Sequence, residues 1–204
     1  MKIITSAVSF IRVCVGTFNN PYVTFRSLSI QKADNTHLFF IVLLTLGYFT
    51  FASLIRTGLQ NPFLLTIRFN SLVLSALIGF IAMLVLLVIG SKLFGGQLNL
   101  PRLIQLWSYT LVPTWVWFFT TSLLYVLLPP PRTMNLTGKV YSSFYVVFSM
   151  MVLFWKMILY YLTLRFGLRF DLYKIAAFSL IVVPFVIAFS VVLFRLGIFR
   201  IPYL

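Results

Sequence analysis

The side chains that could carry out acid–base or metal chemistry are few in this chain. Its 204 residues include two aspartates, no glutamate, one histidine and one cysteine, namely Asp34, Asp171, His37 and Cys14. General acid–base catalysis brings several such groups together, and a structural zinc site takes four strong ligands. A single cysteine also excludes an internal disulfide. We therefore expect no enzyme activity, no catalytic residue, no metal site and no cofactor.

A lysine inside an apolar run is harder to dismiss. Lys156 lies within the stretch MMVLFWKMILYY, and an ammonium near the middle of a bilayer costs about 2.5–3.5 kcal/mol on insertion scales. Such a group is usually paired or functional, yet its four-carbon stem could instead snorkel past Tyr160 toward the headgroups. No carboxylate occurs in the apolar runs, so hydroxyls, carbonyls freed near Pro113 or Pro184, or an anionic lipid phosphate are the candidate acceptors. A functional contact and snorkelling both stay open.

The composition places these groups in a membrane protein. Sixty-one per cent of the chain is hydrophobic and its mean hydropathy is +1.06, which is more apolar surface than a soluble core of this size could hide. The net charge of +14 comes from single cations in the gaps between apolar runs, a layout typical of contact with lipid headgroups. We expect membrane lipids as partners and no nucleic acid.

Five apolar runs are long enough to cross a bilayer, which takes about 20 residues each. The sequence thus predicts an all-α polytopic membrane protein with five transmembrane helices, at residues 37–58, 71–90, 103–128, 141–166 and 175–196. No repeat or polar linker divides them. We expect a segment at residues 1–36 on the cytoplasmic side, followed by one five-helix domain at residues 37–204.

The N-terminal segment has helical periodicity of its own. One face gathers Ile3, Ile4, Ala7, Val8, Ile11, Cys14 and Phe18, and the other gathers Lys2, Thr5, Ser9, Arg12 and Gly16. This pattern predicts an amphipathic helix lying on the membrane surface. Asn20 and Pro21 then predict the start of a second short helix, and Asp34 is expected to cap the first span.

The basic residues near the ends of the spans predict the orientation of the chain. Nine lie on one side, Lys2, Arg12, Arg26, Lys32, Lys92, Arg102, Arg165, Arg169 and Lys174, and six lie on the other, Arg56, Arg68, Arg132, Lys139, Arg195 and Arg200. The majority favours a cytoplasmic N-terminus. On that side Asp34, His37 and Asp171 could form a small polar cluster, but simpler roles exist: His37 can sit at the headgroup level, and Asp171 can cap the fifth span and pair with Lys174.

A polar interruption, LFGGQLNLPRLIQLWSYTLVP at residues 93–113, separates the second and third spans. The double glycine predicts a sharp turn, with Gly95 or Gly96 at positive φ. Asn99 and Pro101 predict a new helix start, and Pro113 should kink the third span. In the second span, Ser71, Ser75 and Gly79 recur every four residues and predict a buried helix contact.

The same stretch carries a family resemblance. Its FGG turn, the following basic residue, the Ser–Tyr pair and the proline resemble the bacterial branch of the Yip1 domain family; the residues are Phe94, Gly95, Gly96, Arg102, Ser108, Tyr109 and Pro113. The similarity continues in PYVTFRSL, in LFWKMILYYLTLRFGLRFDLYKIAAF and at Pro184. The resemblance implies five spans, a cytoplasmic N-terminus and a bacterial inner-membrane location. Eukaryotic relatives act with small GTPases through a longer N-terminal region and a motif that this chain lacks, so a GTPase partner is not carried over.

We expect a scaffold or accessory subunit of a membrane complex, bound to lipids and to a membrane-protein partner or a second copy of itself. The alternative is a subunit of a lipid or small-molecule transport system in which Lys156 contacts an anionic headgroup. The candidate lipid or partner contacts are Lys156, Tyr160, Gly95, Gly96, Arg102, Tyr109 and Pro113.

Overall fold

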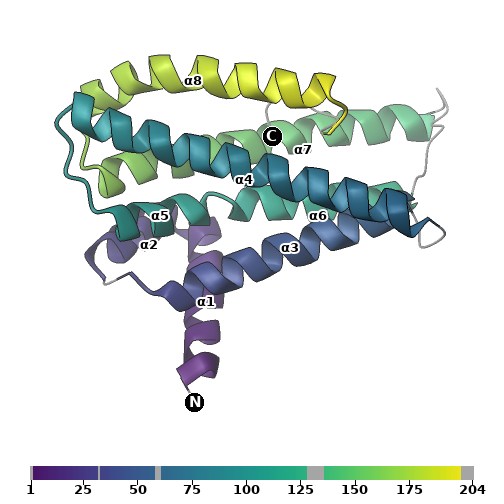
Figure 1. Ribbon diagram of the computed structural model, residues 1–204, viewed down its shortest axis with the longest axis horizontal. Coiled ribbons are helices and arrows are strands. Elements are labelled where there is room, and N and C mark those ends of the chain that lie inside the picture. The colour runs from purple at the N-terminus through teal and green to yellow at the C-terminus, as the bar shows by residue number, and fades with distance from the viewer. Residues whose placement is uncertain (1, 32, 58–60, 128–135, 199–204) are drawn as a thin grey trace.

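The computed structural model describes residues 2–31, 33–57, 61–127 and 136–198. Within these residues the chain is helical and has no strand. The elements are α1 (Lys2–Asn19), α2 (Pro21–Ile30), α3 (Asn35–Thr57), α4 (Pro62–Leu93), α5 (Leu100–Tyr109), α6 (Val112–Leu127), α7 (Leu136–Leu162), the π-helical turn η1 (Thr163–Gly167) and α8 (Leu172–Arg195). The long helices run along the longest dimension of the molecule, and α1 crosses them (Figure 1).

Five helical segments of the described chain are long and apolar enough to cross a membrane: Asn35–Ile55, Pro62–Leu93, Leu100–Leu127, Gly138–Gly167 and Leu172–Arg195. This confirms the predicted all-α fold with five candidate transmembrane helices and two short N-terminal helices. The second segment is longer than expected, because Asn61 and Pro62 begin α4 nine residues before the predicted start. The side chain of Asn61 accepts a hydrogen bond from Leu64 N at 3.4 Å and so caps this helix.

The third span consists of two helices instead of one kinked helix. Residues Thr110 and Leu111 separate α5 from α6, and Pro113 lies in the first turn of α6. A proline inside a continuous helix would leave a carbonyl unpaired and clash with the preceding turn, whereas in a first turn its missing N–H costs little. The chain therefore breaks before Pro113, and Trp115 N restarts the helical pattern by donating to Leu111 O at 3.0 Å.

The two ends of the bundle differ in the elements that they contain. The N-terminal end holds α1, α2, α5 and the connections at residues 94–99 and 168–171; the far end is where α3 finishes, α4 begins and α6 leads toward α7 (Figure 1). Two cores belong to the N-terminal end. One combines Phe10, Phe25 and Leu28 with Ile41, Leu106, Tyr109, Val112, Leu159 and Leu162, and the second contains Met83, Leu87, Leu103, Leu164, Leu168, Phe170, Ile175, Phe178 and Val182.

A smaller core lies toward the far end and contains Phe49, Leu72, Trp117, Phe118 and Val152.

The N-terminal segment is packed into the bundle, since Phe25 is fully buried in the first core. Trp155 Nε1 of α7 also donates to Thr17 O at the end of α1, at 3.1 Å. On α1, however, Ile4, Val8, Ile11 and Phe18 are more than half exposed, as suits a helix with one face on the bundle and another in lipid. Asn20 holds the N-cap position of α2, although its side chain makes no capping hydrogen bond.

The fifth span, α8, lies at the edge of the bundle beside α4 (Figure 1). Small residues on α4 permit the approach, because a Cβ at Gly90 would come within 2.2 Å of the Phe178 ring and one at Gly79 within 2.9 Å of the Phe189 ring. Ser75 is buried, whereas Ser71 is half-buried. The small-residue stripe predicted on the second span is therefore a contact surface from Ser75 to Gly79, and Gly90 extends it.

Candidate functional site

The predicted turn of the FGG motif ends α4 through a glycine in the left-handed region. Gly95 has φ +64°, which confirms the predicted positive φ, and Gly96 N donates to Ser91 O at 2.8 Å. This is the 6→1 hydrogen bond of a Schellman motif, in which the residue after the C-cap is usually glycine because a Cβ there is strained. The Ser91 hydroxyl donates back to Gly96 O at 3.3 Å. The turn is therefore fixed at both of its sides.

A second connection lies directly against this turn. After η1, Leu168 O accepts from Gln97 N at 3.1 Å, and Arg169 donates to the Gln97 side-chain oxygen. A Cβ at Gly96 would come within 2.6 Å of the Phe170 ring and 2.9 Å of Leu168 O, so only glycine allows the two connections to approach this closely. We call residues 94–99 and 168–171 the paired loops.

Backbone strain accompanies this pairing. Arg169 has φ +55° and is the non-glycine residue with positive φ in the described chain, a conformation that costs a side chain about 1–2 kcal/mol. Phe170 N donates to Leu164 O at 3.2 Å across the turn. The π-helical turn before it adds one residue to the hydrogen-bonded ring, and together they aim the Arg169 guanidinium at the neighbouring loop. Strain held by such contacts is characteristic of sites with a specific geometry.

Basic side chains surround the paired loops. Lys92, Arg165 and Arg169 are exposed and Arg102 and Lys174 are half-buried. Asp171 is the carboxylate among them, and its Oδ1 lies 3.4 Å from Arg165 Nη1. The predicted pair of Asp171 with Lys174 is wrong, because the turn at η1 carries Arg165 back to Phe170 O, at 3.0 Å, and to Asp171. Asp171 does hold the N-cap position of α8, but its side chain makes no capping hydrogen bond.

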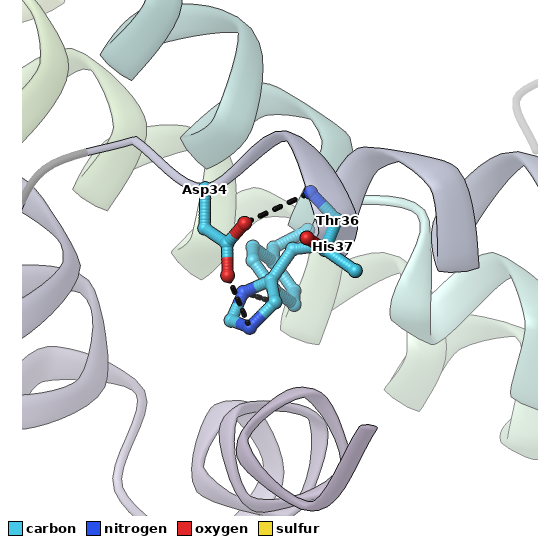
Figure 2. Close-up of polar contacts among 4 residues, drawn as sticks. Asp34, Thr36 and His37 are labelled. Atoms are coloured by element: carbon cyan, nitrogen blue, oxygen red, sulfur yellow. Dashed lines mark hydrogen bonds and ion pairs between the residues drawn. The ribbon is translucent and has the colours of Figure 1, made fainter. Parts of the chain in front are cut away.

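The other aspartate belongs to a buried polar chain at the same end of the bundle. Tyr109 is fully buried and its hydroxyl lies 2.8 Å from His37 Nδ1. On the other side of the ring, His37 Nε2 lies 3.8 Å from Asp34 Oδ2 (Figure 2). His37 is 5% exposed, and its Nε2 makes no hydrogen bond within the described chain. The structure thus brings Asp34 and His37 together as the sequence allowed, adds Tyr109 and leaves Asp171 with Arg165.

Asp34 also caps α3, as predicted. Its Oδ1 accepts from Thr36 N at 2.9 Å (Figure 2), and this hydrogen bond lowers the pKa of the carboxyl, with a smaller contribution from His37. Cys14 packs against the same core from α1. Burial raises the pKa of its thiol to about 12, so the thiol stays protonated and unreactive at neutral pH. Across the described residues, no three of the histidine, cysteine and aspartate side chains gather as metal ligands would.

The remaining predicted contacts divide between the interior and the surface. Pro113 is buried at the start of α6. Arg102, in the first turn of α5, donates its backbone N–H to Asn99 Oδ1 at 3.3 Å, which confirms the predicted helix start. Its side-chain Nε is buried and makes no hydrogen bond with the described residues. Arg102 therefore carries one buried guanidinium nitrogen without a partner in the described chain, at the end of the bundle where the other basic side chains of the paired loops lie.

Lys156 lies closer to the N-terminal end than the sequence suggested. It is 18 residues from Gly138 and 11 from Gly167, the two ends of its span, or about 27 and 16 Å along the helix. Centring the span on a hydrocarbon core of about 30 Å places its Cα about 9 Å inside the nearer boundary. The side chain is half-buried and has no hydrogen bond or ion pair with any described residue. One turn on, the Tyr160 hydroxyl lies 3.5 Å from Ser179 Oγ of α8.

Sequence reasoning missed two of these pairings. His37 and Tyr109 are 72 residues apart, and so are Gln97 and Arg169, so no local spacing signals either contact. The available hint was positional, because all four residues lie near the same ends of their predicted spans. Their positions predict that all four residues lie at one membrane face, but they do not predict which of the four contact each other.

The fold and these sites define a polytopic membrane protein whose polar groups concentrate at one end of a bundle with five candidate spans. A family model described as the Yip1 domain matches residues 15–194, nearly the whole chain. The chain therefore belongs to the Yip1 domain family. Comparisons with curated proteins and with solved structures give no match.

Proposed function

We propose that this chain is a non-catalytic scaffold or accessory subunit of a bacterial inner-membrane complex, with its N-terminus in the cytoplasm and its C-terminus outside. The observation that carries this proposal is the exposed run on α8. Six consecutive residues, from Val183 to Ala188, are exposed, and the large apolar ones among them are 37–45% exposed, so no side of the helix is closely packed there. The contacts of α8 with α4 at Phe178 and Phe189 lie on either side of this run. A helix that packs closely at two points and only partly between them leaves a length of apolar surface for a neighbouring transmembrane helix.

Lipid binding at the paired loops fits the same role. The five basic residues around them, with one carboxylate, give this end of the bundle an affinity for anionic headgroups of about 1 kcal/mol per cation near the surface. The scarcity of side chains for acid–base chemistry supports a binding role in place of catalysis. The partner is a membrane protein or a second copy of this chain, and a small GTPase has no support.

Site-specific photocrosslinking in native membranes tests the proposal. A photoreactive residue at Ile187 on α8 should yield one defined protein adduct, either a membrane partner that also co-purifies at constant stoichiometry or a second copy of this chain. The matched control is Val147, an exposed apolar residue on α7. Crosslinks to lipid alone at both positions would overturn the proposed role.

The orientation has a separate test. A reporter that is active only outside the cytoplasm should be silent when fused after Lys32 and active when fused after Leu204. Activity at both fusion points would require an even number of spans and would contradict the proposed topology.

A role in lipid or small-molecule transport is the second candidate, favoured by Lys156 alone. Lys156 is half-buried as a residue and its ammonium lacks a polar partner in the described chain, so an anionic headgroup would supply the missing charge. Lys156→Met keeps the stem and removes the charge, and it should reduce the copurifying anionic lipid. Lys139→Met, at an exposed position near the start of the same helix and away from the paired loops, is the matched control. Unchanged lipid content, partner retention and host-complex activity in Lys156→Met would identify a snorkelling lysine and remove this candidate.

A further inference from the structure

A pocket opens between α3 and α4 near the far end of the bundle, away from the paired loops. It has a volume of about 220 Å³ and is lined by Thr50, Ser53, Leu65, Thr66 and Phe69. Three of these five residues carry hydroxyls, although both helices are strongly apolar. The volume could hold about seven waters at the density of the liquid, or one branched polar group with the start of a chain.

The hydroxyls of this pocket differ in their remaining capacity to donate or accept hydrogen bonds. Thr50 Oγ1 donates to Leu46 O at 2.9 Å and Thr66 Oγ1 donates to Pro62 O at 2.8 Å, so their protons are used and their lone pairs remain. Ser53 is fully buried, and its Oγ makes no hydrogen bond in the described chain. A buried hydroxyl without a partner is destabilising. Ser53 therefore offers an O–H donor to a pocket whose other hydroxyls can only accept.

The depth of the pocket indicates what could fill it. With 32 residues, α4 is about 48 Å long, so it exceeds a hydrocarbon core of about 30 Å by about 9 Å at each end. Leu65, Thr66 and Phe69 lie three to seven residues from Pro62, or about 5–10 Å along the helix. This is the level at which headgroups give way to acyl chains. The ester carbonyls of a diacyl lipid lie at that boundary and are strong acceptors without protons of their own.

We propose that the α3–α4 pocket binds one diacyl phospholipid of the adjoining leaflet, with an ester carbonyl accepting from Ser53 Oγ and the upper acyl chain against Leu65 and Phe69. The occupant is the lipid's glycerol-ester region and not its headgroup. The site therefore differs from the basic surface at the opposite end of the bundle, and it does not depend on the proposed scaffold role. The bound ester would accept the hydrogen bond of the Ser53 hydroxyl, as a buried water would. Its acyl chain would also cover the apolar wall of the pocket.

The test compares two lipids that differ only in the proposed contact. The purified full chain in detergent is titrated with dioleoyl phosphatidylglycerol and with its di-ether analogue, and bound lipids are counted by native mass spectrometry. The diester should bind about fivefold more tightly at one site, the ratio expected for one net hydrogen bond. In Ser53→Ala the two lipids should bind equally. Equal binding of both lipids to the unmodified chain would show that the pocket does not recognise esters and would overturn the proposal.

A pocket-filling variant checks the location independently. Thr66→Phe places a ring over the opening from an exposed position and should remove the single tight lipid. The matched control is Ser142→Phe. Ser142 is exposed near the start of α7, at the far end of the bundle. Its hydroxyl donates to Gly138 O at 3.0 Å, just as the Thr66 hydroxyl donates to Pro62 O. Loss of binding in both variants would indicate general annular lipid, and retention in Thr66→Phe would indicate a different site; either result contradicts the proposal.

Discussion

The two ends of the bundle use the same apolar helices and close in different ways. At the N-terminal end, the short helices and the paired loops cover the spans, and the largest fully buried side chains, among them Tyr109, Phe25, Phe170 and Leu87, all belong to this end. The far core has five members that are 3–8% exposed. Beside it lie a pocket and two buried hydroxyls, Ser53 and Thr57, without hydrogen-bond partners in the described residues.

This difference in packing predicts different responses to substitution at the two ends. Close packing makes a core sensitive to any change of volume, so the N-terminal end should respond strongly to substitutions that touch nothing outside the protein. A looser region with an open pocket gains stability from a ligand that fills the pocket. The far end should therefore tolerate substitution in detergent and respond mainly through lipids or partners.

The largest effect is expected where the paired loops touch. In Gly96→Val the new side chain would meet the Phe170 ring and the backbone oxygen of Leu168, and overpacking of this kind typically costs about 2–3 kcal/mol. The free energy of unfolding in mixed micelles measures it. Gly47→Val is the control, since no atom lies within 4 Å of a Cβ at Gly47 and the change should stay within about 0.5 kcal/mol. Similar losses in both variants would mean that the loops are not tightly paired.

The buried polar chain should give the next largest effect. Tyr109→Phe removes the hydroxyl that lies 2.8 Å from His37 Nδ1 and leaves a buried ring nitrogen unsatisfied, a loss of about 1–3 kcal/mol. Farther along the bundle, Ser149→Ala removes the acceptor of Trp117 Nε1 at 2.9 Å. Ser149 is half-buried, so this second loss should be about 0.5–1 kcal/mol. Thermal unfolding of both variants shows at which end the lost hydrogen bond costs more stability. A larger loss of stability in Ser149→Ala than in Tyr109→Phe would contradict the tighter packing of the N-terminal end.

Replacing a serine by alanine should change the stability in opposite directions at the two ends. Ser91→Ala removes the hydroxyl that donates to Gly96 O in the FGG turn and should destabilise the protein by about 1 kcal/mol. Ser53→Ala removes a buried hydroxyl that has no partner in the described chain and should be neutral or stabilising by up to about 1 kcal/mol in lipid-free detergent. Restoring diacyl lipid should cancel that gain. Destabilisation by Ser53→Ala without lipid would show that the hydroxyl is satisfied within the protein.

The parts of the fold that follow from local chemistry were predictable. Apolar runs of sufficient length gave the five spans, the double glycine gave the positive φ of Gly95, and Asp34 was expected to cap α3. Each of these depends on a few neighbouring residues and on the bilayer or backbone geometry. These features therefore do not depend on which helices pack together.

The missed features depend on how distant segments meet. Pro113 correctly marked a disturbance, but whether the chain kinks or breaks depended on Thr110 and Leu111, whose backbone N–H groups leave the α-helical pattern and donate to Trp107 O and Ser108 O. The partner of Asp171 changed from Lys174 to Arg165 because a π-helical turn shifts the register by one residue. The α3–α4 pocket had no sequence signal, since threonines and serines in membrane helices ordinarily bond to their own backbone.

The smallest effect compares the caps that begin α3 and α4. Asp34 caps α3 at the N-terminal end with a carboxylate whose pKa is lowered by the Thr36 hydrogen bond, whereas Asn61 caps α4 at the far end with a neutral amide. Because the folded-state pKa of Asp34 lies below its unfolded value of about 3.9, its contribution is complete above that value and is lost as the pH falls through the folded pKa. Only the first cap should therefore be sensitive to acid.

Asp34→Asn keeps an acceptor for Thr36 N and removes the charge, so it isolates this contribution. The Asp34 side chain is 43% exposed, and solvent screening should hold the difference in unfolding free energy below about 1 kcal/mol. In thermal unfolding, the unmodified chain and the variant should differ most at about pH 5–7, and the difference should shrink as the pH falls below about 3.9. The same comparison in an Asp171→Asn background excludes the other carboxylate, and Asn61→Ser, which changes the far cap without a charge, should give a difference that does not vary over this range. A constant difference between the unmodified chain and the Asp34→Asn variant at all pH values would mean that the carboxylate acts by shape alone, and the two ends would then begin their helices in the same way.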